Sequence, residues 1–202
     1  MKKVVILFAI LAAFFAVYWF QIREKTIINE PRQQALKVNR HDAAFNGNID
    51  SLLQNYFEIK AFLVDADSVN AKLAATKLAV FLSRLNIDEL KKDTAAIFES
   101  ATMFVNDIKT NAASMGSQQS ITEMRQDFKG ISENLYPFLK TIHYEGNILY
   151  WQNCPMAFGE DKGANWISSS EEIINPYMGK HHPEYKGTML HCGEVKDSIK
   201  AQ

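Results

Sequence analysis

The chain has 202 residues, of which 47% are hydrophobic and 22% are charged, and its formal net charge is -1 at pH 7. This length fits one globular domain with extensions, and the hydrophobic share is sufficient for a packed core. The near-zero charge, and the lack of Lys/Arg runs with interleaved aromatic residues, argue against a nucleic-acid-binding protein.

The first 20 residues have the pattern of a membrane anchor. Two lysines precede an unbroken run of 17 apolar residues, 4–20, which would span roughly 26 Å as a helix. The run ends in three aromatic residues, which suit a membrane interface, whereas a signal peptidase site needs small residues. We expect an uncleaved inner-membrane anchor, with a cleaved signal peptide as the alternative. The lysines favour the cytoplasmic side, so the remaining chain is expected in the periplasm.

Residues 21–47 are polar, contain Pro31 and show little apolar periodicity. This composition predicts a linker between the anchor and the folded domain. His41 has no partner nearby in the sequence, so we expect it to be solvated.

Four amphipathic helices are predicted between residues 48 and 145, because apolar residues recur there at steps of three and four. The four sets are Ile49, Leu52, Tyr56, Ile59 and Leu63; Ala71, Ala75, Leu78, Leu82 and Leu85; Ile97, Ala101, Phe104 and Ile108; and Ile121, Met124, Phe128, Ile131, Leu135, Leu139 and Ile142. Residues 111–119 are interpreted as a loop, after which Ser120 and Glu123 fit a capping box. Short connections predict a mainly α fold, an antiparallel four-helix bundle.

The helical period is lost after residue 145, and 146–202 is predicted to form an irregular C-terminal cap within the same domain. Residues 148–151 and 189–192 resemble short β-strands, and one helical turn is expected at 169–174. The histidine-containing segment 181–184 is expected to be a solvated loop. An irregular segment of this length is usually functional, or is held by a bond or a metal ion.

Both cysteines of the chain lie in this cap, close to methionines. Cys154 and Met156 are two residues apart, and Met189 and Cys192 are three apart, with His191 beside the second cysteine. Thiolates and thioethers are soft ligands that suit Cu(I) and similar ions, and imidazole is a common additional ligand. If the two ends of the cap meet, these residues form a candidate soft-metal site.

A disulfide is the alternative interpretation of the two cysteines, because paired cysteines are common in exported domains. A bond between Cys154 and Cys192 would contribute roughly 4 kcal/mol in the chain-entropy model. A catalytic cysteine is disfavoured because no His–Asp partner set is identifiable, and no G-x-S-x-G motif is present. We therefore expect no enzymatic activity.

Five short motifs resemble a known family. They are Y-x-x-I-K-x-x-L-V-x-x-D at 56–67, C-P-M-A at 154–157, G-A-x-W-I-S at 163–168, I-x-N-P-Y-x-G at 173–179 and M-L-x-C-G-E-V at 189–195. Together they resemble a domain-of-unknown-function family of exported bacterial proteins, which also occurs at the C-terminus of periplasmic adaptor subunits of heavy-metal efflux pumps. The chain departs from that pattern in a longer interval at 180–188, and it lacks the barrel and hairpin domains of an adaptor.

The resemblance implies handling of a soft metal such as copper, and it places metal binding beside the disulfide as an interpretation of the sulfur residues. The predicted function is a non-enzymatic envelope binding module for a soft metal, linked to metal efflux. Its expected partners are efflux or other envelope proteins and the inner membrane through 4–20. A disulfide-stapled protein-interaction domain without metal is the alternative.

Overall fold

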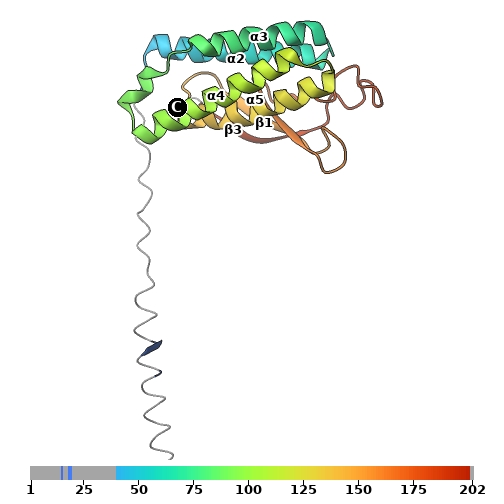
Figure 1. The fold of residues 1–202 in the computed structure, drawn as a ribbon. Coiled ribbons are helices and arrows are strands. Elements are labelled where there is room, and N and C mark those ends of the chain that lie inside the picture. The colour runs from blue at the N-terminus through green and yellow to red at the C-terminus, as the bar shows by residue number, and fades with distance from the viewer. Residues whose placement is uncertain (1–14, 16–17, 20–39, 201–202) are drawn as a thin grey trace, which may run out of the picture. The chain divides into compact units, whose positions relative to one another are not determined.

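The structure is a computed structural model that describes residue 15, residues 18–19 and residues 40–200 (Figure 1). The predicted anchor in 1–20 and the linker as far as residue 39 lie outside the described residues, apart from those three positions, and remain predictions. Within the described residues, no helix is both long enough and apolar enough to cross a membrane.

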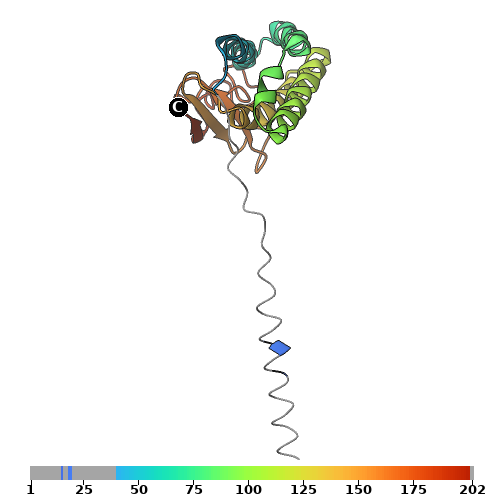
Figure 2. The ribbon, with the colours of Figure 1, turned by 90° about the vertical axis from the view of Figure 1, so that its left-hand side faces the viewer.

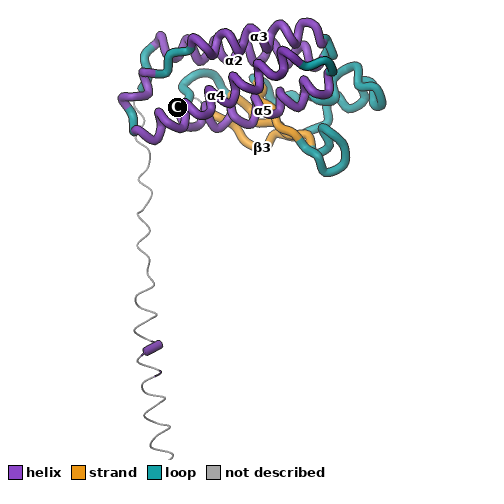
Figure 3. Tube along the Cα trace, viewed as in Figure 1, coloured by secondary structure: helices purple, strands orange, loops and turns teal. Residues whose placement is uncertain are grey.

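Four α-helices form most of the chain between residues 40 and 145 (Figure 3). They are α2 (Ala43–Val64), α3 (Ser68–Arg84), α4 (Ala95–Ser117) and α5 (Ile121–Thr141), with a 3-10 helix, η1 (Asp88–Lys92), between α3 and α4. Each α-helix packs against the next one along the chain, and the short connections make neighbours antiparallel. The predicted mainly α fold with four bundled helices is confirmed.

Side chains that accept hydrogen bonds from free backbone N–H groups set the starts of the helices. Asp42 Oδ1 accepts from the N–H of Phe45 at 2.7 Å at the start of α2. At the start of α5, Ser120 Oγ accepts from the N–H of Glu123 at 3.2 Å, and the Glu123 carboxylate accepts from the N–H of Ser120 at 3.3 Å. This reciprocal pair confirms the predicted capping box.

Two helix boundaries differ from those predicted. The first described helix, α2, begins at Ala43, inside the expected linker. The helix α4 continues to Ser117 through the segment predicted as a loop. It does so because Ala112 and Met115 lie on its core-facing side and are fully buried, so tertiary packing extends the helix where the local sequence is ambiguous.

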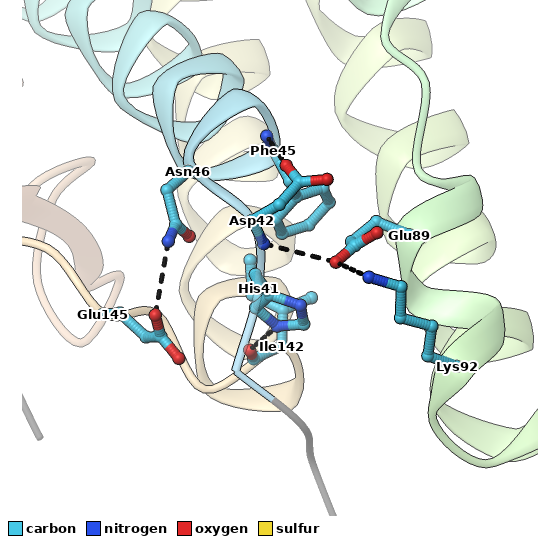
Figure 4. Close-up of polar contacts among 8 residues, drawn as sticks. All are labelled: His41, Asp42, Phe45, Asn46, Glu89, Lys92, Ile142 and Glu145. Atoms are coloured by element: carbon cyan, nitrogen blue, oxygen red, sulfur yellow. Dashed lines mark hydrogen bonds and ion pairs between the residues drawn. The ribbon is translucent and has the colours of Figure 1, made fainter.

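The chain entering α2 is fastened to two other elements (Figure 4). His41 Nε2 lies 2.8 Å from the carbonyl oxygen of Ile142, just after α5. The backbone N–H of Asp42 donates to Glu89 Oε1 of η1 at 3.2 Å. The expectation of a solvated His41 is therefore wrong, because its partner comes from a distant part of the sequence.

A small antiparallel sheet follows the helices, with the strand order β2-β1-β3. Its strands are β1 (Leu149–Cys154), β2 (Ala164–Ser168) and β3 (Glu194–Ile199). The strand predicted at 148–151 corresponds to β1. The strand predicted at 189–192 is wrong because that segment forms a turn. The helical turn expected at 169–174 is also wrong, because no helix forms there. The actual third strand was missed because β3 is mostly exposed and charged.

The sheet lies alongside the helices and shares their core, with β2 packed against α5 (Figures 1 and 2). Tyr56 of α2 stacks on Phe128 of α5 with ring centroids 4.9 Å apart. The buried Tyr56 hydroxyl accepts from the N–H of Ile167 in β2 at 2.9 Å. Tyr177, from the loop before β3, contacts both Phe128 and Trp166. These aromatic contacts bind the sheet and the loop to the helices.

Candidate functional site

The structure brings the two cysteines together. Cys154 is the last residue of β1, and Cys192 lies in the turn that precedes β3. Because β1 and β3 are paired, with Asn153 opposite Glu194, the two cysteines meet at the end of that ladder. Their Sγ atoms are 3.2 Å apart.

The two thiols differ in their exposure. Cys154 is completely buried, whereas Cys192 is only partly buried. Burial raises the pKa of Cys192 to about 11, with a further contribution from the adjacent Cys154. The Cys192 thiol is therefore mostly protonated at pH 7, and a metal ion that binds it has to displace this proton.

Only a small movement separates the two sulfur atoms from the shorter distance of a disulfide or from the longer distance of two thiolates on one metal ion. A disulfide requires about 2.05 Å between its sulfur atoms. Two thiolates on one tetrahedral ion, with metal–sulfur bonds of about 2.3 Å, lie about 3.8 Å apart. The observed 3.2 Å falls between these values, so the fold prepares the pair for a covalent bond or for a shared ion.

Asn175 holds the cysteine turn in place. This fully buried residue donates from Nδ2 to the carbonyl oxygen of Cys192 at 2.8 Å, and its N–H donates to the carbonyl of Leu190 at 2.8 Å. Its Oδ1 accepts from the N–H groups of Tyr177 and Met178 at 2.8 and 3.1 Å. The side chain thus holds two segments in place at once. The sequence motif at 173–179 contains Asn175, but it did not reveal this role.

The glycine after Cys192 is required by its surroundings. Gly193 has φ +145°, and a Cβ atom there would lie 2.7 Å from the carbonyl oxygen of Asn153. A side chain would therefore push β1 away from the cysteine turn. The Cys-Gly sequence permits the close approach that brings the sulfur atoms together.

The other predicted ligands do not converge on the cysteines in the same way. The Met189 carbonyl accepts from the N–H of Cys192 at 3.0 Å, so Met189 opens the turn, and its side chain packs on the core. Met156 lines a separate hollow that neither cysteine lines. His191 Nδ1 lies 2.8 Å from the carbonyl oxygen of Ile173.

Among residues 40–200, no three or more His, Cys, Asp or Glu side chains are grouped closely enough to hold a metal ion. His191 is therefore not assembled with the two thiols in this conformation. Its Nδ1 contact with a carbonyl is the arrangement that leaves Nε2 available as a ligand atom in metal sites.

The helical region has a counterpart among known protein families. It resembles an uncharacterised family. The family described as "Protein of unknown function (DUF3347)" matches residues 52–146, which run from within α2 to the segment just before β1. The match therefore supports the expected relationship to a domain of unknown function for the helices, and the cysteine motifs lie beyond it. No curated protein and no solved structure matches the chain.

Proposed function

We propose that this protein is a non-enzymatic binding module of the bacterial envelope that holds a soft metal ion, such as Cu(I), between Cys154 and Cys192. The observation that carries the proposal is the 3.2 Å separation of two sulfur atoms that lie 38 positions apart in the sequence. Thiolate sulfur favours Cu(I) over hard cations. The partly exposed Cys192 gives an ion access to the buried Cys154.

The neighbouring residues support a soft ion with few ligands. Met189 begins the turn that carries Cys192, and its thioether is a candidate third sulfur ligand. Met156 and His191 would need to reorient to join the site. Their predicted roles as ligands therefore depend on a movement of the cap when metal binds.

The link to metal efflux rests on the resemblance of the cap motifs and the helices to exported proteins and efflux adaptors. A module tethered by residues 4–20 and facing the periplasm would receive or deliver ions beside an efflux protein. Its partners would be envelope proteins rather than nucleic acid, in agreement with the nearly neutral net charge.

Titration of the reduced, full-length protein in detergent with Cu(I) against a competing chelator tests this function. We expect one tightly bound ion per chain, lost in Cys192→Ser and weakened in Met189→Leu. Met103→Leu is the matched control, because Met103 is 66% exposed on α4. Binding should also weaken as the pH falls, because protons compete for the raised-pKa thiol of Cys192.

A disulfide-stapled interaction domain is the second candidate, favoured by the same sulfur separation. It predicts that thiols disappear on mild oxidation and that Cu(I) does not bind the reduced protein. Counting free thiols before and after oxidation, alongside the titration, separates the two functions. Absence of Cu(I) binding in the reduced state would refute the metal-binding function.

A further inference from the structure

Arg125 carries a buried positive charge, and it forms no ion pair with a carboxylate in the part of the chain that the structure describes. The residue is 5% exposed in the first turns of α5. Its Nε donates to the carbonyl oxygen of Pro176 at 3.0 Å, and its Nη2 donates to that of Leu63 at 3.2 Å. Both partners are neutral carbonyls, and among the described residues no Asp or Glu forms an ion pair with Arg125.

The usual compensation for such a charge is incomplete. Leu63 is close to the C-terminal end of α2, and a helix end supplies at most about half a negative charge. A buried arginine normally has a carboxylate or a phosphate in addition to carbonyl partners. Nη1 has no partner among the described residues, so the guanidinium retains donors for one more group.

The backbone fixes the guanidinium in this position. Gly179 has φ +60°, and a Cβ atom there would lie 2.9 Å from Arg125 Nη2 and 2.7 Å from the carbonyl oxygen of Val64. The loop after Tyr177 is therefore pressed directly against the arginine. An arginine held this firmly on two sides is pre-organised for a ligand on its open side.

Arg125 lines a hollow of about 310 Å³ between α5 and the cap, a size at the lower end for small-molecule sites. Thr122 and Gln126 of α5, and His182 and Tyr185 of the cap loop, contribute polar groups to its wall. The apolar part comes from Met156, Ala157, Phe158, Tyr177 and Met178. The hollow thus combines a buried cationic group, Arg125, with an apolar surface.

The hydrogen bonds of His182, which lines the hollow, determine which ring nitrogen carries its proton. His182 Nδ1 accepts from the N–H groups of Glu184 and Tyr185, both at 3.3 Å, so the neutral ring carries its proton on Nε2. Burial, followed by the charge of Arg125, lowers the pKa of His182, in agreement with a site that repels cations. Glu184, exposed to solvent, is the one carboxylate among the described residues that line the hollow.

We propose that this hollow binds a small organic carboxylate, whose oxygens accept hydrogen bonds from Arg125 and whose apolar body rests on Met156 and Phe158. A metal cation is disfavoured there by the adjacent guanidinium, although Met156 and His182 would suit one. The hollow does not include either cysteine, although Met156 is a candidate residue in both sites, and the proposal does not depend on the proposed metal function.

Binding of benzoate to the full-length protein in detergent, measured by ligand-observed NMR with protein-free micelles as the blank, tests the proposal. Benzamide is the neutral probe of the same shape. We expect saturable benzoate binding and at least about tenfold weaker benzamide binding, since loss of one charge-assisted contact has this effect. Equal binding of the two probes, or no saturable benzoate binding, would overturn the proposal.

Substitutions at Thr122 locate the site without removing Arg125, whose loss threatens folding. Thr122 is exposed one turn before Arg125 and lines the same hollow. Thr122→Glu places a carboxylate beside the guanidinium and should abolish benzoate binding. Thr122→Gln, whose side chain has the size of glutamate but no charge, should retain it. Glu184→Gln should strengthen binding by removing a repelling charge. Unchanged binding in Thr122→Glu, or tighter binding of inorganic phosphate than of benzoate, would contradict a carboxylate site.

Discussion

At the scale of single residues, three polar side chains, of which Asn175 and Arg125 are buried and Lys60 is half-buried, connect segments that lie far apart in the sequence. Asn175 fixes the cysteine turn, Arg125 joins α2 to the cap loop, and Lys60 joins α2 to β2 by donating to Ser168 Oγ at 3.1 Å. Each side chain links segments that are distant in the sequence. Removing any one of them therefore acts on the tertiary structure rather than on a single helix.

The low pKa of Lys60 should make the free energy of unfolding depend on pH. Burial lowers its pKa to about 8, below the unfolded value, so the charged form destabilises the folded state at pH 7. This destabilisation is fully present below the folded pKa and disappears as the pH rises through the unfolded pKa. Lys60→Met should therefore raise the free energy of unfolding at pH 7 by up to about 3 kcal/mol.

Urea unfolding at pH 7 and pH 10 measures this effect. The gain of Lys60→Met over the wild type should shrink at the higher pH. Lys77→Met is the matched control, because Lys77 is exposed and pairs with Glu58 on the surface, where such pairs contribute little. A variant less stable than the wild type at pH 7 would show that the bond to Ser168 outweighs the burial cost.

At the scale of secondary-structure elements, helix starts are set locally and strand pairing is not. Ser120 and Glu123 form their capping box within one turn of chain. The strands β1 and β3, in contrast, are separated by 39 residues of loops, turns and β2. The register that unites the cysteines is consequently sensitive to glycine and asparagine residues at the turns.

The capping box gives an element-scale prediction. Ser120→Ala removes the acceptor for the N–H of Glu123 and should lower the free energy of unfolding by about 1 kcal/mol. Ser117→Ala, three residues earlier at the end of α4, should change it by less than about 0.5 kcal/mol. Chemical denaturation of both variants makes the comparison, and equal losses would contradict the role of the cap.

At the scale of the whole molecule, the cysteine pair belongs to the same hydrophobic core as the helices. Cys154 packs in a cluster that also contains Tyr56, Phe128, Trp166 and Tyr177. Forces that act on the pair are therefore transmitted to the helices through close packing. Ligand binding at the sulfurs should stabilise the complete domain rather than the cap alone.

Thermal unfolding of the reduced protein with and without one equivalent of Cu(I) checks this expectation. The proposed function predicts a single transition, monitored by the helical signal, that moves to higher temperature with Cu(I). The shift should vanish in Cys192→Ser and persist in Met103→Leu. A shift confined to the tryptophan signal, with an unchanged helical transition, would indicate a cap that unfolds independently.

The sequence by itself determined the four helices, the capping box at Ser120 and the position of β1, because periodicity and caps act over a few residues. It indicated Cys154 and Cys192 as candidates but left their relation open. Only the tertiary structure decided that they meet, that β3 completes the sheet, and that Arg125 lies in a hollow although it falls on the apolar stripe of α5. These features depend on contacts between distant segments, whose geometry follows from the packing of the whole chain and not from any local pattern.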